Sequence, residues 1–162
     1  MWFFMNSCYA LTAISFLMLL LTALQGYFHF NILNANHPTF ALLTVIVYLF
    51  TQTLIIFFFV GTGVSIRDYT NEKKLDTIYR QRSLTIKRKL YPPTLLNMLL
   101  VMVLFITGGA VDTGRIVPGI HGLLFLVCLL HFLKMILIQH GSFKEETAVI
   151  LEMSGVRPAQ SK

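Results

Sequence analysis

Residues 40–60 read FALLTVIVYLFTQTLIIFFFV and contain no Lys, Arg, Asp or Glu. A helix needs about 20 mainly apolar residues to cross the hydrocarbon core of a bilayer, so this stretch has the length and composition of a transmembrane helix. Its surroundings are equally uncharged, because the first charged side chain in the sequence is that of Arg67. Two membrane spans joined by a short polar turn explain this distribution, whereas a water-soluble domain carries charge over its whole surface.

The whole chain has the same apolar character. Of its 162 residues, 56% are hydrophobic and 12% are charged, and the mean hydropathy is +0.71. Soluble domains are about one quarter charged, which argues against a soluble fold here. Runs of about 20 apolar residues predict four membrane spans. The expected spans are residues 3–24, 40–60, 93–111 and 116–138.

The expected fold is therefore an all-α integral membrane protein, a four-transmembrane-helix bundle. Residues 1–140 make up this single transmembrane domain, and residues 141–162 follow as a short tail. The first span lacks the charged start and the shorter apolar run of a secretory signal peptide, so we expect it to be retained. Pro38, Pro92 and Pro93 are expected in the first turns of the second and third helices, where the missing N–H of proline is tolerated.

Basic residues are concentrated in one connection. Residues 67–91 hold eight of the 13 Lys and Arg side chains, and the other two connections hold only Arg115. Because cytoplasmic loops are enriched in Lys and Arg, we expect this basic loop between the second and third helices to be cytoplasmic. With four spans, both termini are then cytoplasmic as well, an N-in/C-in topology. The expected location is a bacterial inner membrane or an organellar equivalent.

The basic loop has two interpretations. The simpler one is a positive-inside loop that is extended by a helix end. Alternatively, Leu75, Ile78 and Tyr79 at helical spacing indicate an interfacial helix that lies against anionic lipid headgroups. The loop contains no nucleic-acid-binding motif, so no nucleic acid partner is expected.

The sequence offers little for catalysis. The basic loop contains no His/Asp/Ser or paired-carboxylate arrangement, so we expect no catalytic activity of the chain's own. Cys8 and Cys128 fall in different spans at different depths, and a disulfide between them is not expected. No cysteine pattern of a zinc site is present.

The histidines are the residues suited to redox chemistry. A b-type haem held by two histidines needs a pair at matched depth on facing helices. His121 lies toward the outer end of the fourth span, and the turn between the first two spans is flanked by His29 and His37. We therefore expect His121 and His29 as the axial pair, with His37 as the substitute, and haem iron as the only metal.

A quinone or lipid-headgroup pocket at the same outer side is the alternative. Its hydrogen bonds would come from His121, Asp112 and Arg115. Asp112 and Arg115 are three residues apart, so an ion pair that only shapes the outer turn is the simpler interpretation of these two residues.

His131 lies inside the fourth span, where a charged group is costly. The second span contains the polar group TQT, which consists of Thr51, Gln52 and Thr53. This group and His131 lie at about the same distance past the centres of their spans, and therefore at a similar depth in the membrane. We therefore expect a neutral His131 that packs against the second helix and hydrogen-bonds to this group.

Lys134 is closer to the cytoplasmic side. Its long side chain can extend to the membrane interface, so no transport role is needed to explain it. Asn97 of the third span is expected at a similar depth.

These features predict a small polytopic subunit that acts through helix–helix contacts in a larger membrane complex, of a respiratory or electron-transfer kind. The lipid bilayer, other membrane subunits and anionic headgroups at residues 67–91 are its expected partners. One alternative is a protein that binds haem b or quinone near the outer face. Another is a stand-alone small membrane protein of unknown activity.

Overall fold

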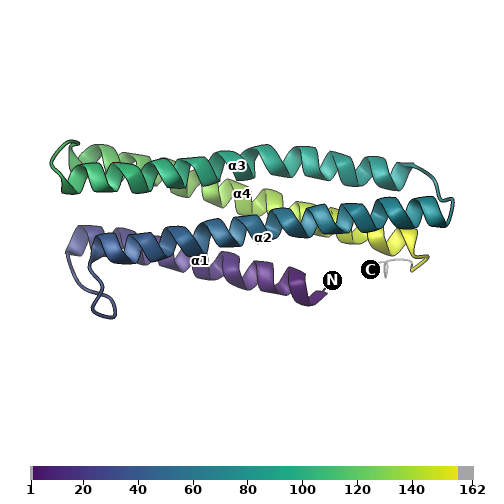
Figure 1. Ribbon diagram of the computed structural model, residues 1–162, viewed down its shortest axis with the longest axis horizontal. Helices are drawn as coiled ribbons and strands as arrows, with labels where there is room; N and C mark the ends of the chain where they lie inside the picture. Colours follow the sequence, from purple (N-terminus) through teal and green to yellow (C-terminus); the bar gives the residue numbers. More distant parts are fainter. Residues whose placement is uncertain (1, 157–162) are drawn as a thin grey trace, which may run out of the picture.

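The computed structural model describes residues 2–156, which form a bundle of four antiparallel helices (Figure 1). The helices are α1 (Trp2–Phe28), α2 (His37–Glu72), α3 (Ile78–Asp112) and α4 (Pro118–Met153). All four are long and apolar enough to cross a membrane. The predicted fold class is confirmed at this level: the chain is an all-helical, multi-pass membrane protein in contact with the bilayer.

The two ends of the bundle differ in chemistry. The turns of residues 29–36 and 113–117 lie at one end, which we call the histidine end because His37 and His121 are there (Figure 1). The turn of residues 73–77, the start of α1 and the C-terminal end of α4 lie toward the other end, which we call the basic end.

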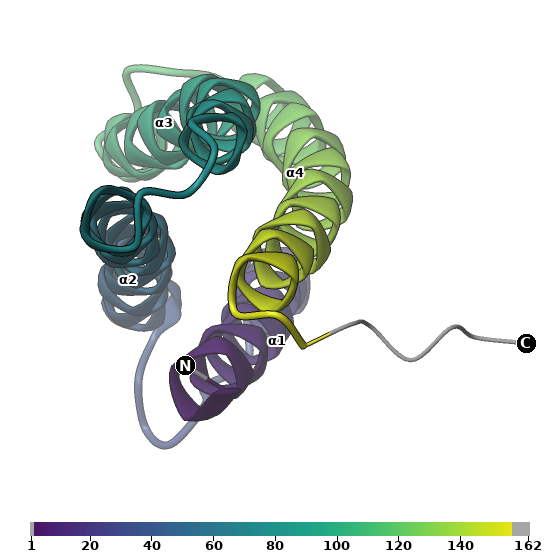
Figure 2. The same ribbon diagram turned by 90° about the vertical axis from the view of Figure 1, so that its right-hand side faces the viewer.

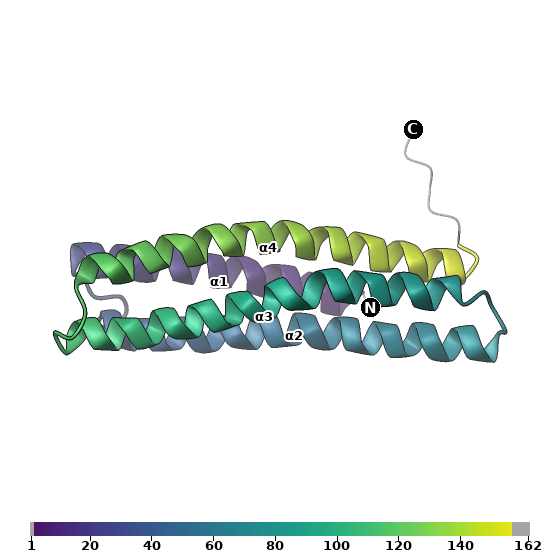
Figure 3. The ribbon, with the colours of Figure 1, turned by 90° about the horizontal axis from the view of Figure 1, so that it is seen from above.

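The helices are longer than the expected spans, and residues 67–91 are mostly helical rather than a loop. α2 continues to Glu72 and α3 begins at Ile78, so only residues 73–77 form the turn. At the basic end α2, α3 and α4 continue past the start of α1 (Figure 3). This segment, which we call the stem, continues the bundle axis instead of lying across it as an interfacial helix. It comprises residues 61–72, 78–92 and 139–153.

The stem is helical because its sequence continues the core pattern. In α3 the buried residues recur every three or four positions, the spacing of helices that pack at a shallow angle. They are Ser83, Ile86, Leu90, Thr94, Asn97, Val101 and Leu104. In α4 they are Cys128, Phe132, Met135, Gln139, Ser142, Phe143, Glu146 and Val149. Residues assigned to a loop and a tail on charge therefore pack as helix.

The prolines confirm one expected helix start and correct another. Pro38 lies in the first turn of α2, where the side chain of Asn36 caps the helix by accepting a hydrogen bond from the Thr39 N–H (3.2 Å). Pro92 and Pro93 instead lie inside α3. The packing of the preceding turns against α2 and α4 therefore outweighs the backbone hydrogen bonds that these two prolines cannot donate.

The interior contains many polar side chains, and large apolar side chains cover much of the outer surface. Each of the four helices has buried Thr, Ser, Asn or Gln side chains, as is common between transmembrane helices. Large apolar side chains such as Ile106 and Leu130, 68% and 67% exposed, cover the outside. This distribution suits a bundle whose outer surface is solvated by lipid.

Candidate functional site

Two histidines face each other at the histidine end. His37 is the first residue of α2, and His121 lies in the first turn of α4. Their ring centres are 6.5 Å apart and their planes are inclined at 82°. Seen along the bundle in Figure 2, the helices follow one another from α1 to α4 around the axis, so α2 and α4 are diagonal partners. The histidine pair therefore bridges two helices that are not neighbours in the bundle.

Both imidazoles are held through Nδ1. His37 Nδ1 is 3.1 Å from the carbonyl oxygen of Thr22, which can only accept, so Nδ1 carries the proton. His121 Nδ1 is 3.3 Å from the hydroxyl of Thr107, and that hydroxyl already donates to the Leu104 carbonyl (2.8 Å). It must therefore accept from His121 Nδ1. In the neutral ring each Nε2 then keeps its lone pair, which is the arrangement found in metal-binding histidines.

A glycine lies against each ring. A Cβ added to Gly26 of α1 would be 2.9 Å from His37 Cε1, and one added to Gly108 of α3 would be 3.2 Å from His121 Cε1. The first distance is too short for a real Cβ, and the second is tighter than most Cβ contacts. Each hairpin, α1–α2 and α3–α4, thus positions its histidine with a glycine and an oxygen from its first helix.

His29 is not part of this pair. It is exposed and has a φ of 54°, in the left-handed region, directly after the last residue of α1. A residue in this conformation ends the helix and turns the chain away. The structure therefore brings His121 together with His37, the predicted substitute, rather than with His29, because His37 begins the next helix and faces the interior.

The other outer candidates, Asp112 and Arg115, are both exposed. Asp112 is the last residue of α3, and Arg115 lies in the following turn, where its N–H donates to the Ala110 carbonyl (2.8 Å). The ion pairs found within residues 2–156 do not include one between these two side chains.

His131 contacts the third helix rather than the TQT group. The side-chain amide of Asn97 donates to His131 Nδ1 (2.9 Å), and its oxygen accepts a hydrogen bond from the hydroxyl of Tyr48. Asn97 and Tyr48 are fully buried. The packing role predicted for His131 therefore has Asn97 as its partner, one helix away from the one expected.

The TQT side chains have partners of their own. Gln52 accepts a hydrogen bond from Gln139 of α4 (2.7 Å), and Thr51 is bonded to Ser15 of α1 (3.0 Å). Thr53 is half-buried. The group therefore joins α2 to α1 and α4, as interhelical hydrogen bonds do in membrane bundles.

The side chains of Lys134, Cys8 and Cys128 take no part in these hydrogen bonds, although the Cys128 carbonyl also accepts from the Asn97 side-chain amide (3.4 Å). Lys134 is exposed on the outer face of α4, which leaves its side chain free to extend along the helix. Cys8 and Cys128 are buried as free thiols.

Replacing Asn97 by alanine is expected to lower the stability of the bundle. The change leaves the Tyr48 hydroxyl and His131 Nδ1 without their partner, and an unpaired buried polar group costs about 1–3 kcal/mol. Thermal unfolding of the purified protein in mild detergent measures the effect. Asn71→Ala, at an exposed position of α2, is the matched control and should unfold as the wild type does. Equal unfolding temperatures for all three proteins would contradict the role of Asn97.

Glu146 is a buried carboxylate that the sequence analysis assigned to the tail. It is 0% exposed and accepts hydrogen bonds from Thr62 of α2 (2.9 Å) and Ser83 of α3 (3.0 Å). The signal that would have found it is the spacing of Gln139, Ser142 and Glu146, which continues the buried face of α4 beyond the apolar span.

The fold and these side chains define a class of protein: a four-helix, multi-pass membrane protein with a pair of histidines across one end of its bundle. No family model, curated protein or solved structure matches the chain.

Proposed function

We propose that the protein binds a b-type haem at its histidine end, with His37 and His121 as the axial ligands of the iron. The observation that carries the proposal is the pair of rings from diagonal helices, 6.5 Å apart, each with Nδ1 engaged. Two imidazoles bound to opposite sides of one metal, with bonds of about 2.0–2.1 Å, place their ring centres roughly 6 Å apart. The observed separation agrees with this requirement.

The chain's own residues would hold and orient the ligands. Thr22 and Thr107 fix the tautomer of each imidazole, and such outer partners make the other ring nitrogen a better ligand. Gly26 and Gly108 allow each ring to lie close to the neighbouring helix. Haem would supply one-electron chemistry when bound, and holding its iron with two histidines would favour electron transfer over oxygen binding.

A one-electron carrier needs a donor and an acceptor, so the protein acts as a small subunit of a larger electron-transfer complex in the membrane. Its exposed apolar helix faces are available to lipid and to the helices of other subunits. The stem adds a charged surface, with Arg82 paired to Glu152 and Lys89 paired to Glu145 (3.4 Å). We assign this end, with the eight basic residues of 67–91, to the cytoplasm of a bacterial inner membrane or an organellar equivalent, beside anionic headgroups.

A reduced-minus-oxidised absorption spectrum of the protein purified in mild detergent tests the haem. We expect the bands of a six-coordinate b-type haem and about one iron per chain by elemental analysis. The absence of these bands after expression with sufficient haem, or a stoichiometric amount of copper or zinc instead of iron, would overturn the proposal.

The orientation has a separate test. A single reactive cysteine at Lys73, in the turn of the basic end and in a background without Cys8 and Cys128, should resist membrane-impermeant thiol reagents in intact cells. It should react after the membrane is permeabilised. Strong labelling in intact cells would place the basic end outside.

A further inference from the structure

The stem contains a polar site that the haem proposal does not use. Its centre is Glu146 of α4, whose Oε1 accepts hydrogen bonds from Thr62 and Ser83. Its other oxygen, Oε2, is buried without a hydrogen-bond partner. A buried carboxylate in which only one oxygen accepts hydrogen bonds has a high free energy, unless the other oxygen is protonated or bonded to water.

Two further oxygen atoms are in the same condition. The hydroxyl of Ser142, one turn before Glu146 on the same face of α4, is buried without a partner, and so is the hydroxyl of Tyr91 on α3. Ser142, like Glu146, is 0% exposed. Buried polar groups of this kind are normally completed by internal water, which makes about three hydrogen bonds to its site. Ser142, Tyr91 and Glu146 thus each contribute a buried oxygen atom without a hydrogen-bond partner to this part of the stem.

A lysine is seated next to the site. A Cβ on Gly63 of α2 would lie 1.6 Å from the Nζ of Lys87, so the ammonium occupies the space that the missing side chain leaves. Lys87 is one turn after Ser83 on α3, and Gly63 follows Thr62 on α2, so the residues beside it are the ones that bond to Glu146. The ion pairs found within residues 2–156 do not include Lys87 with Glu146.

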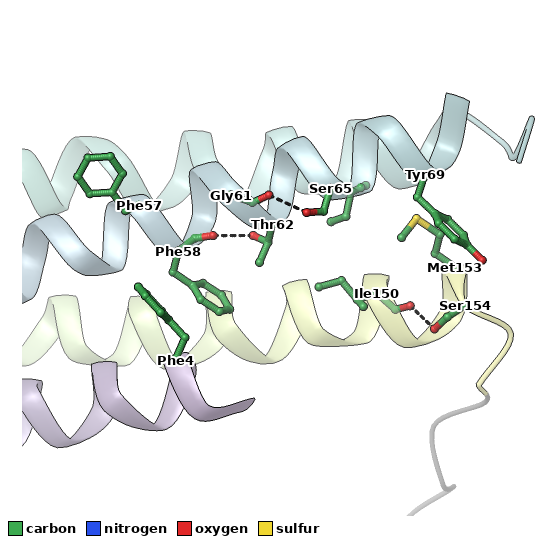
Figure 4. Close-up of a pocket in the computed structure, with 11 residues that line it drawn as sticks. Phe4, Phe57, Phe58, Gly61, Thr62, Ser65, Tyr69, Ile150, Met153 and Ser154 are labelled. Carbon is green, nitrogen blue, oxygen red and sulfur yellow. Dashed lines mark hydrogen bonds between the residues drawn. The ribbon is translucent and has the colours of Figure 1, made fainter. Parts of the chain in front are cut away.

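An open groove lies beside the site. It has a volume of about 560 Å³ and lies between α2 and α4 at the start of α1, where Phe4 lines it, and Thr62 forms part of its wall (Figure 4). The same Thr62 hydroxyl is within hydrogen-bond distance of both Glu146 Oε1 (2.9 Å) and the Phe58 carbonyl (3.0 Å). One side chain thus links the open groove to the buried carboxyl group.

We infer that Glu146 is a proton-binding site in the stem, which takes up a proton and its hydrating water from the solvent at the basic end. In the protonated form the carboxyl is neutral and its Oε2–H donates to the water shared with Ser142 and Tyr91. When the proton leaves, the carboxylate gains the Lys87 ammonium as its nearest counter-charge. The inference is independent of the haem, which lies at the other end of the bundle.

The surrounding charges determine the direction of the titration. Burial raises the pKa of Glu146, and the hydrogen bonds from Thr62 and Ser83 and the charge of Lys87 oppose this. Burial lowers the pKa of Lys87, while the charge of Glu146 raises it and that of Arg67 lowers it. α1 carries no Lys, Arg, Asp or Glu.

This direction also fixes how stability depends on pH. Because the folded-state pKa of Glu146 is raised, its proton stabilises the fold below the ordinary carboxyl pKa. That contribution is lost as the pH rises through the folded-state pKa. Thermal stability should therefore fall as the pH rises from the ordinary carboxyl pKa through the raised pKa of Glu146. Glu146→Gln should remove this contribution to the pH dependence.

Infrared spectroscopy of the full-length protein tests the inference, in a detergent without ester or carboxyl groups. In the wild type we expect the carbonyl band of one neutral carboxylic acid to persist above the pH at which exposed carboxyl groups ionise, and to shift in D₂O. Glu146→Gln should remove this band. Glu145→Gln is the matched control, because Glu145 is exposed and paired with Lys89, and it should keep the band.

Lys87→Met provides a test that leaves Glu146 in place. Removing the positive charge should move the disappearance of the band to higher pH, because Lys87 lowers the pKa of Glu146. The inference is overturned if the wild type has no such band, if the band survives Glu146→Gln, or if Lys87→Met leaves its titration unchanged. Loss of the band on adding sodium at constant pH would show a metal-cation site instead.

Discussion

His121→Ala is expected to abolish the b-type haem spectrum of the purified protein. Removing one of two axial ligands leaves a single histidine to hold the iron, and even the loss of an outer partner of a metal ligand lowers affinity about 10–100-fold. We therefore expect haem occupancy to fall by at least about tenfold in His121→Ala and in His37→Ala. Iron content per chain and the reduced-minus-oxidised spectrum measure the loss.

His29→Ala is the control for this experiment. His29 lies in the turn that precedes His37, is exposed, and is not part of the histidine pair. Its replacement should leave occupancy at the wild-type level. A result in which His29→Ala loses the haem and His37→Ala keeps it would show that the pairing first expected from the sequence, and not the one in the structure, is used.

The helical fold could be predicted from the sequence because a long apolar segment in a membrane has few alternatives to forming a helix. Each expected span lies within one helix, except that the fourth begins two residues before α4. The helix ends were not accessible in the same way. Residues 67–91 were set apart as a loop by their charge, yet positions such as Ile86 and Leu90 continue the buried face of α3. Charge reports contact with water, while the spacing of buried residues decides whether the chain is helical there.

The histidine site could also be predicted only in part. Residue type and depth selected His121 and the two histidines of the outer turn, but the choice between His29 and His37 depended on where α1 ends. That end is set by the left-handed conformation of His29, which the sequence does not reveal. Glu146 was missed for the opposite reason, because a carboxylate is almost never buried unless it is paired, so a single Glu beyond the last span was assigned to solvent.

The hydrogen-bond partner of His131 could not be predicted from the sequence either. Depth placed it level with the TQT group, and the prediction then depended on which helix faces it. In the bundle α3 and α4 are neighbours while α2 and α4 are diagonal (Figure 2), and the residue that bonds to His131 is Asn97 of α3. Depth along a span is readable from sequence, but rotation about the helix axis is set by packing.

The glycines at the histidine pair give the second large prediction. Gly26→Ala places a Cβ 2.9 Å from His37 Cε1, which is closer than two carbon atoms can approach, so the ring must move. Movement of the ring disturbs the hydrogen bond from Nδ1 to the Thr22 carbonyl and changes the position of Nε2 relative to His121. We expect haem occupancy to fall about tenfold, the scale seen when an outer contact of a metal ligand is lost. Gly108→Ala should act in the same direction with a smaller effect, because its Cβ would be 3.2 Å from His121 Cε1.

Gly109→Ala separates this effect from any general effect of replacing a glycine in a helix. Its added Cβ would have no atom within 4 Å. Alanine favours a helix over glycine by about 1 kcal/mol, so each of these changes should stabilise its helix if the histidines are ignored. Haem loss in Gly26→Ala together with unchanged occupancy in Gly109→Ala therefore points to the displaced ring. Equal occupancy in both variants would show that the close contact between Gly26 and His37 does not position a ligand.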